Sequence, residues 1–325
     1  MYDICALGEL IVDCTPVGKT ELGAGIFACN PGGAPGNVAV SMSKLGKRAA
    51  FIGKVGNDQF GKFFIELFRK NGIETRGILL DSDWNTTLAF VELDEKGERS
   101  FGFYRKMCAD VMLEEKEVDR QLLGEAKLFH FGSVSLTQEP SRTATFRAAE
   151  YMKENNRIVS YDPNYRENLW SSRQDALEIM RKGFLYADVV KVSDEELFLF
   201  TGIGDVERAG RVLYERYPMR CLLITLGEKG ACCIFKDSFF TVPGYRMEVA
   251  DTNGAGDASM GGFLFKLTGF EKEIEDLSTE EVYECLRFAN AAGALATTKS
   301  GAIPAMPLRE EVEALLKREE IGKNV

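Results

Sequence analysis

The sequence predicts an α/β fold in which helices cover both faces of a mainly parallel β-sheet. Strand-like apolar runs alternate with helix-like runs along most of the 325 residues, an alternation that is typical of such folds. Two segments, 10–28 and 86–104, instead contain short strand-like runs with no helix between them. We therefore expect a single domain over residues 1–325, with a three-layer α/β/α core and a small second β-sheet.

The elements follow from the apolar runs and from local stop signals. A first strand is expected at 4–7, a helix at 37–45 that ends at Gly46, and a strand at 49–55. The next helix, 60–70, ends at the Asn71-Gly72 pair, a common helix stop. The same alternation predicts strands at 127–132, 157–161, 189–192, 221–225, 231–235 and 239–249, and helices at 141–155, 175–186, 258–267 and 282–299.

The two segments without helices are candidates for one small sheet. In the second segment, the runs 87–93 and 100–104 flank a polar turn at 94–98, which is a hairpin pattern. Together with 10–28, this hairpin could project from the core and act as a lid. A decorative hairpin with no role in ligand binding is the alternative.

Composition excludes several classes of protein. The net charge is −10 and no long basic cluster occurs, which argues against nucleic acid as a partner. No apolar run reaches the length of about 18 residues that a membrane span needs, and the N-terminus does not resemble a signal peptide. We therefore expect a cytoplasmic protein that does not act at a membrane.

Cysteine and histidine usage argues against a metal centre built from these residues. None of the eight cysteines forms a C-x-x-C pair, so we expect buried thiols in a reducing compartment. His130 is the only histidine. It lies in an apolar strand-like run and is expected to be a core or strand-end residue.

The most informative segment is 251–257, Asp-Thr-Asn-Gly-Ala-Gly-Asp, between a strand-like and a helix-like run. Its small residues let the backbone approach a ligand, and the following helix would direct unpaired N–H groups at an anion. Asp257 would lie beside that anion in the first helical turn and could accept a hydroxyl proton. A plain structural turn is the alternative. No P-loop string occurs, and Ser259 breaks the dinucleotide fingerprint.

Further ligand groups are expected at strand ends and at one helix start. Asn37, after the glycines of 32–36, could bind a sugar hydroxyl or could merely cap its helix. Arg166 and Asn164, in the Asp-Pro-Asn-Tyr-Arg segment 162–166, could hold a phosphate or form a solvated turn. Glu196 could hold Mg²⁺ through water, with Ser193 as a helix cap.

These pieces, in this order, resemble the ribokinase–fructokinase family of carbohydrate kinases over nearly the whole chain. The stretch 251–264 is similar to one family signature, and 32–39, with Gly46 and Gly56, to the other. The resemblance implies a ribokinase-like fold with a small β-sheet lid, MgATP as phosphoryl donor and a sugar hydroxymethyl group as acceptor. The exposed lid sheet could also pair with a second subunit in a homodimer.

Within the family, the chain is most similar to fructokinases. The similarity lies in 162–166 with Leu169-Trp170, in 191–194, and in 103–105 with Ala109-Asp110. It implies transfer of the ATP γ-phosphate to the 6-hydroxyl of D-fructose. A 2-keto-3-deoxygluconate kinase, or another furanose or nucleoside kinase of the family, is the alternative. The broken fingerprint argues against a dinucleotide oxidoreductase, and the intact Asp257 argues against a non-catalytic sugar sensor.

The resemblance also assigns residues by position. Asp257 matches the catalytic base, assisted by the anion hole of Gly254, Ala255 and Gly256 and by Arg166. The sugar-binding positions are Asp13, Gly32, Gly33, Asn37, Phe103, Arg105, Asn164 and Asp257. The nucleotide positions are Lys191, Ser193, Thr225, Gly227, Gly230, Gly254, Gly256 and Asn290. Glu196 matches a Mg²⁺-binding acid, although Ser193 replaces the usual asparagine of that motif. A monovalent cation, K⁺, is expected at Asp251, Asn253, Ala296 and Gly301, and Ala305 stands where some members have serine.

Overall fold

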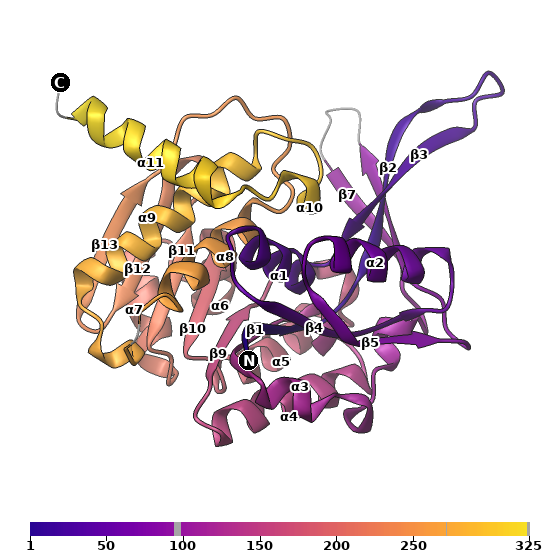
Figure 1. The fold of residues 1–325 in the computed structure, drawn as a ribbon, viewed down its shortest axis with the longest axis horizontal. Coiled ribbons are helices and arrows are strands. Elements are labelled where there is room, and N and C mark those ends of the chain that lie inside the picture. The colour runs from indigo at the N-terminus through magenta and orange to yellow at the C-terminus, as the bar shows by residue number, and fades with distance from the viewer. Residues whose placement is uncertain (94–98, 271, 324–325) are drawn as a thin grey trace.

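The main sheet has nine strands, in the order β13-β12-β11-β10-β9-β8-β1-β4-β5. They are seen in a computed structural model that describes residues 1–93, 99–270 and 272–323 (Figure 1). The strands are β1 (Tyr2–Leu7), β4 (Ala49–Gly56), β5 (Glu74–Asp81), β8 (Ala126–Gly132), β9 (Ile158–Asp162), β10 (Val189–Ser193), β11 (Cys221–Thr225), β12 (Gly230–Phe235) and β13 (Ser238–Pro243).

Most of this sheet is parallel. In the sheet order from β5 to β11, neighbouring strands pair in parallel, whereas the pairs β11–β12 and β12–β13 at one edge are antiparallel. The central strands are apolar on both faces because helices cover both faces. Cys5 of β1, for example, lies fully buried between Ala50 of β4 and Phe129 of β8.

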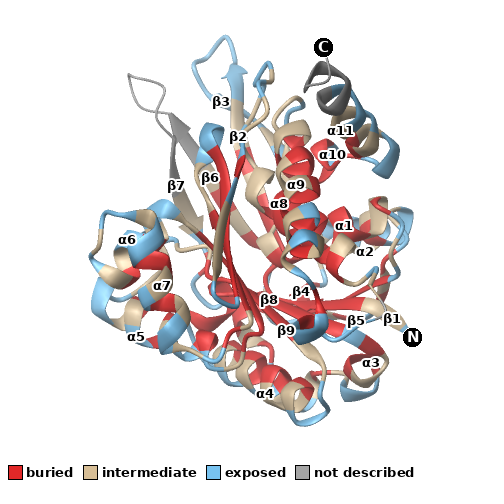
Figure 2. Ribbon diagram, turned by 90° about the vertical axis from the view of Figure 1, so that its left-hand side faces the viewer, coloured by how far each residue is buried: buried red, intermediate tan, exposed pale blue. Residues whose placement is uncertain are grey.

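Two layers of helices enclose the sheet, and Figure 2 shows the buried strands between them. One hydrophobic cluster joins the sheet to the helices α1 (Ala34–Lys44), α2 (Gln59–Lys70), α8 (Ala255–Leu267) and α9 (Thr279–Ala296). The cluster on the other face includes α3 (Arg120–Gly124), α4 (Ser141–Glu154), α5 (Arg173–Phe184), α6 (Asp194–Thr201) and α7 (Val206–Arg216). The short α10 (Ala302–Ala305) and α11 (Arg309–Lys323) end the chain. The predicted α/β/α architecture is confirmed.

A second sheet of four strands, in the order β3-β2-β6-β7, projects from the core (Figure 1). Its strands are β2 (Ile11–Lys19), β3 (Gly25–Gly32), β6 (Thr87–Leu93) and β7 (Arg99–Tyr104), so both segments without helices contribute to it. The predicted turn 94–98 lies outside the described residues. One face of this sheet carries Ile11, Ala89 and Phe103, which pack with Val134 and Leu169 of the core loops.

Several elements were not predicted, and each lacks a clear local signal. Strand β5 carries polar residues because it lies at the edge of the sheet, while α7 and α11 are rich in charged residues. The expected strand 239–249 ends at Pro243. Helix α1 begins at Ala34 rather than at 37, with Pro35 in its first turn, where proline is well tolerated. Over the described ranges, every helix is too short or too polar for a membrane span.

Candidate active site

The predicted site residues gather at the carboxyl edge of the parallel strands. Asp162, Ser193 and Thr225 are the last residues of the adjacent strands β9, β10 and β11. Since parallel strands all end at the same edge, their following loops meet there. The four-stranded sheet begins directly after β1, so it stands at this same edge.

Asp257 lies at the centre of the site, in the first turn of α8, and is only 8% exposed. The side-chain amide of Asn37 donates to one carboxylate oxygen at 2.8 Å, and that of Asn164 donates to the other at 3.3 Å. Burial raises the pKa of Asp257, while the Asn37 hydrogen bond and the charges of Lys191 and Arg166 oppose the shift. The carboxylate is therefore held in one orientation with a raised proton affinity.

The start of α1 depends on two glycines. A Cβ on Gly32 would lie 2.5 Å from the Asp13 carboxylate, and a Cβ on Gly33 would lie 2.3 Å from the Glu9 carbonyl oxygen. Gly33 is the N-cap of α1, with φ of 114°, a conformation that other residues rarely adopt. Asn37 therefore lies inside the helix, and the interpretation of Asn37 as a helix cap is wrong.

Asp13, on β2, extends the acidic centre toward the four-stranded sheet. Burial raises the pKa of Asp13 to about 6, opposed by the charge of Arg166 and by a hydrogen bond with the Asn253 side chain. The charge of Asp257 raises this pKa further. The predicted sugar residues Asp13, Asn37 and Asn164 thus surround the predicted base. Asn164 reaches it from a left-handed backbone conformation, with φ of 51°.

The glycine turn before α8 brings backbone and cation together. Gly254 has φ of 78°, and a Cβ there would lie 2.8 Å from the Ala302 Cβ. At Gly256 a Cβ would lie 3.4 Å from the Lys191 ammonium nitrogen. Ala255 and Gly256 are the first residues of the helix, where backbone N–H groups and the helix dipole favour an anion. The structure therefore adds a buried ammonium group to the predicted anion hole.

Lys191 is paired with Asp162 at 2.7 Å, and both side chains are almost fully buried. Burial alone would lower the pKa of Lys191, but the neighbouring carboxylates of Asp162 and Glu196 raise it, so the ammonium form is favoured. The second Asp162 oxygen is buried without a hydrogen-bond partner among the described residues. An ammonium group so placed can serve both its carboxylate and an anion on the glycine turn.

Glu196 is held by the backbone. Its two oxygens accept the N–H groups of Tyr165 at 2.7 Å and of Ser193 at 2.9 Å, and the Ser193 hydroxyl accepts the Glu196 N–H in return. Burial and the charge of Asp162 raise the pKa of Glu196. A carboxylate has about four lone-pair positions, so each oxygen keeps one for a metal-bound water. No cluster of three or more possible His, Cys, Asp or Glu ligands occurs in the described part of the chain.

The expected monovalent-cation residues also lie together. One Asp251 oxygen accepts the Asn253 N–H at 3.0 Å, and the other accepts the Gly301 N–H at 3.1 Å. The backbone N–H groups of Ala250 and Asp251 both donate to the Thr297 carbonyl, next to Ala296. Two loops 50 residues apart are thus joined behind the glycine turn.

The expected nucleotide turn follows β11. Gly227 and Gly230 have φ of 58° and 105°, and a Cβ on Gly230 would lie 2.1 Å from the Val242 carbonyl oxygen. The Thr225 hydroxyl points back to the Val192 carbonyl at 3.5 Å. Asn290 of α9 donates its amide to the carbonyls of Val242 and Pro243 at 3.2 and 2.8 Å. This turn therefore lies next to Ser193, at the carboxyl edge of the parallel strands.

Two predicted sugar residues have additional structural roles. The Arg105 guanidinium is 3% exposed and donates to Asp110 at 2.7 Å, to Thr137 at 2.6 Å and to the Val134 carbonyl at 3.0 Å. Three of its five N–H groups are thus used inside the protein. Phe103 lies opposite Ala89 on the face of the small sheet that packs against the core loops. Their contacts with a sugar remain a prediction.

Glu9 was not predicted. It lies just after β1, is 2% exposed, and accepts the Ala34 N–H at the start of α1 at 3.0 Å. Burial raises the pKa of Glu9 to about 7, against the opposing charge of Arg105. A single acid in the apolar run 4–12, directly after a strand, was the only signal that could have identified it.

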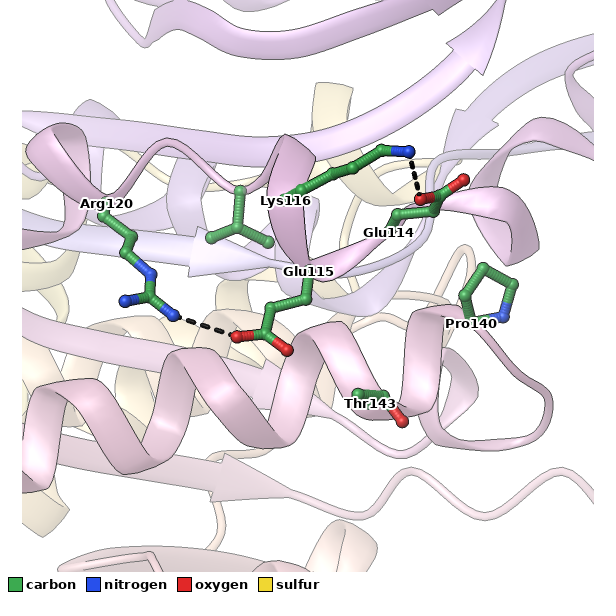
Figure 3. Close-up of a pocket in the computed structure, with 7 residues that line it drawn as sticks. Glu114, Glu115, Lys116, Arg120, Pro140 and Thr143 are labelled. Atoms are coloured by element: carbon green, nitrogen blue, oxygen red, sulfur yellow. Dashed lines mark hydrogen bonds and ion pairs between the residues drawn. The ribbon is translucent and has the colours of Figure 1, made fainter.

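A separate hollow of about 760 Å³ lies on the outer surface, between the turn at 114–118 and α4 (Figure 3). Its charged side chains pair with one another: Lys116 with Glu114 at 2.7 Å, and Arg120 with Glu115 at 2.9 Å. None of the predicted site residues lines it. This hollow therefore does not contribute to the candidate active site.

Known proteins are similar to this chain in sequence and in fold. The model of the pfkB family carbohydrate kinases matches residues 1–309. Fructokinase-1 of Zea mays is 42% identical over 317 residues, which cover 97% of this chain and 98% of that protein. The structure of a Xylella fastidiosa fructokinase with bound ATP superposes with a TM-score of 0.91 at 34% identity, covering 98% of this chain and 100% of that one. The structure of a Vibrio cholerae fructokinase bound to fructose, ADP and calcium superposes with a TM-score of 0.86 at 34% identity. The match covers 97% of this chain and 98% of that one.

Proposed function

The chain belongs to the pfkB family of carbohydrate kinases, and we propose that it is a fructokinase that transfers the γ-phosphate of ATP to the 6-hydroxyl of D-fructose. The buried Asp257, held by two amides beside a glycine turn at a helix start, is the observation that carries this proposal. The relatives with bound ATP, or with fructose and ADP, support the same pair of substrates.

In the proposed reaction, Asp257 accepts the proton of the sugar 6-hydroxyl as that oxygen attacks the γ-phosphorus. The new O–P bond forms while the bond to the β-phosphate oxygen breaks, and ADP leaves. The N–H groups at the start of α8 hold the charge on the transferring group, together with Lys191 and Arg166. Most of the rate enhancement then comes from positioning and from charge stabilisation.

The sugar would bind between α1, β2 and the loop after β9. Asp13 and Asn164 are placed to bind hydroxyl groups, and Gly32 and Gly33 let the chain pass close to Asp13 and to the Glu9 carbonyl at the side of this site. Asn37 would orient Asp257 and use its amide oxygen, which has no partner among the described residues. Phe103 and Arg105 complete the proposed pocket from the small sheet.

The nucleotide would bind along the ends of β10 and β11. The turn with Thr225, Gly227 and Gly230, together with Ser193 and Asn290, would accommodate it. Mg²⁺ would neutralise phosphate charge when bound, and it commonly keeps several waters and few protein ligands. Glu196, with one lone pair left on each oxygen, fits a contact through such a water.

A monovalent cation, K⁺, is part of this proposal. Asp251, Asn253, Ala296 and Gly301 lie on two loops that hydrogen-bond each other behind the glycine turn. A cation there would add positive charge near the transferring phosphate. Ala305 offers no side-chain oxygen, so the backbone would have to provide the remaining ligands.

The remaining expectations concern partners and location. The hairpin of β2 and β3 exposes Val17, Leu22, Ile26 and Phe27, and a second copy of the chain that covers them would give a homodimer through the small sheet. All eight cysteines are free thiols, which suits the cytoplasmic location proposed from the sequence. Sugar and nucleotide, rather than nucleic acid or a membrane, are the proposed partners.

A coupled ADP-release assay across a sugar panel tests the function. We expect kcat/KM for fructose to exceed the values for ribose, nucleosides and 2-keto-3-deoxygluconate by at least about tenfold, the discrimination that one or two pocket contacts provide. A higher value for 2-keto-3-deoxygluconate would replace fructose by that acid, with Arg105 and Arg166 as candidates for its carboxylate. The absence of sugar-dependent ADP release would reject a kinase altogether.

A further inference from the structure

Two cysteines face each other across the small sheet. Cys14 of β2 is paired directly with Cys29 of the antiparallel strand β3, and their sulfur atoms are 3.8 Å apart. Direct antiparallel partners have Cα atoms about 4.5 to 5.5 Å apart, within the usual range for a disulfide. A small rotation of the two side chains would therefore bring the sulfurs to bonding distance.

These two thiols differ in access to solvent. Cys29 is exposed, whereas Cys14 is 3% exposed, and burial raises the pKa of Cys14 to about 12. The other six cysteines are all buried. Among these, Cys221 and Cys233 have sulfurs only 3.4 Å apart, but Cys233 pairs with Leu223 rather than with Cys221. The sulfurs of Cys221 and Cys233 are closer together than those of Cys14 and Cys29, but both thiols are buried. The pair is therefore an internal control for the effect of solvent access on oxidation.

We propose that Cys14 and Cys29 are a thiol-modification site that a low-molecular-weight disulfide oxidises to a cross-strand disulfide bond. The Cys29 thiolate attacks one sulfur of the small disulfide, forms a mixed disulfide and releases one small thiol. Cys14 then loses its proton to solvent, attacks the Cys29 sulfur and releases the second small thiol. The two cysteines are oxidised by two electrons, and the small disulfide is reduced by the same two.

The new bond would act on the residue next to Cys14. Asp13 lies on the opposite face of β2, and its carboxylate is packed so closely against Gly32 of β3 that no Cβ fits between them. The bond fixes the spacing and twist of the two strands at positions 14 and 29, and therefore the position of Asp13 relative to Gly32. This effect on sugar binding rests on the proposed function, whereas formation of the disulfide does not.

The first experiment incubates the full-length protein with oxidised glutathione and reads the product by mass spectrometry. Closure of the disulfide lowers the mass by about 2 Da and leaves no glutathione adduct. Trypsin cuts after Lys19, so the oxidised protein should yield the peptide 1–19 linked to 20–44, a linkage that dithiothreitol removes. A stable glutathione adduct on Cys29, a bond between two chains, or preferential linkage of Cys221 to Cys233 would each overturn the proposal.

The second experiment measures kinetics before and after oxidation. We expect the fructose KM to rise by about three- to tenfold and to return with dithiothreitol, while the ATP KM changes less than about twofold. Cys29→Ser is the control, because this exposed position tolerates a polar side chain and the variant cannot form the bond. An unchanged fructose KM in the disulfide form, or an equal rise in oxidised Cys29→Ser, would reject the link to sugar binding but not the disulfide. A protein without kinase activity would reject the proposed function and leave the mass-spectrometric result intact.

Discussion

At the scale of single residues, the environment of Asp257 suits the proposed role of this carboxylate as a base. Burial raises its pKa, whereas the hydrogen bond from Asn37 and the charges of Lys191 and Arg166 oppose that shift. The two amides also leave little rotational freedom. Asn37 therefore acts on both the orientation and the proton affinity of the carboxylate.

The exchange Asp257→Asn keeps the shape of the side chain and removes its ability to accept a proton. We expect kcat to fall by roughly two to four orders of magnitude, the range for a positioned general base. ATP affinity, measured by calorimetry, should change little, because the N–H groups of α8 remain. A correctly folded variant with near-normal turnover would contradict the role of Asp257.

Glu9 predicts a pH-dependent stability. Its pKa is about 7 in the folded protein and about 4.3 in an unfolded chain, so the folded state binds its proton more tightly. The contribution of Glu9 to folding stability is therefore largest below about pH 4.3, and roughly 3 kcal/mol of this contribution is lost as the pH rises toward 7.

The exchange Glu9→Gln keeps the acceptor for the Ala34 N–H and removes the ionisation. Relative to the unchanged protein, we expect the thermal unfolding midpoint of Glu9→Gln to rise progressively between pH 5 and pH 8. Because all other ionisable groups are present in both proteins, their effects cancel in the difference between the two midpoints. Parallel midpoint curves for the two proteins would show that Glu9 ionises normally.

At the scale of elements, the first turn of α1 links three parts of the site. Glu9 binds its first N–H group, Gly33 sets its direction, and Asn37, one turn later, reaches Asp257. Helix α8 then packs against α1, where Gly261 leaves room for Ser41. The contact between Asn37 and Asp257 therefore depends on how two helices pack.

The exchange Gly33→Ala tests this arrangement, and Gly46→Ala is its control. Both glycines have positive φ, 114° and 104°, but only at Gly33 would a Cβ meet other atoms within 4 Å. Backbone strain alone costs about 1–2 kcal/mol, and forced overlap adds about 1–3 kcal/mol. Calorimetric unfolding should therefore show a much larger loss in Gly33→Ala, together with a raised fructose KM. Equal losses in both variants would mean that the α1 start can shift to make room.

At the scale of the whole molecule, short chain connections and buried hydrogen bonds join the small sheet to the core. Strand β2 follows β1 after only three residues. Asp110 accepts hydrogen bonds from Thr87, at the start of β6, at 2.6 Å and from Arg105, just after β7, at 2.7 Å. Since Arg105 also binds Thr137 and the Val134 carbonyl, the base of the sheet is fixed while its strands extend outward.

Fructose should close this sheet over the site and exclude water. We expect hydrogen exchange in β2, β3 and the start of β6 to slow when saturating fructose is added, while β1 and β11 change little. The variant Asp13→Ala, which lacks a proposed sugar contact, should lose most of this slowing. Identical exchange with and without fructose in an enzyme shown to bind the sugar would reject a closing lid.

Local chemistry explains which parts of the site could be predicted. The glycine turn before Asp257 and the segment around Asn164 combine special backbone residues with chemical groups within a few positions, so the sequence alone identified them. Glu9 has no such neighbours, and the pairing of Cys14 with Cys29 depends on the register of two strands. Arg105 was expected only to reach the substrate, but it also forms a buried ion pair with Asp110.

The sequence by itself determined the alternation of strands and helices, the glycine turn before Asp257 and the family of kinases. These depend on residues that are close along the chain, where apolar period, glycine and proline act directly on the backbone. Only the tertiary structure decided which distant groups meet, such as Asn37 with Asp257, 220 residues away, or Lys191 with Asp162 beneath Gly256. Such contacts depend on strand order and helix packing, and differences of about an ångström in these decide whether a hydrogen bond forms.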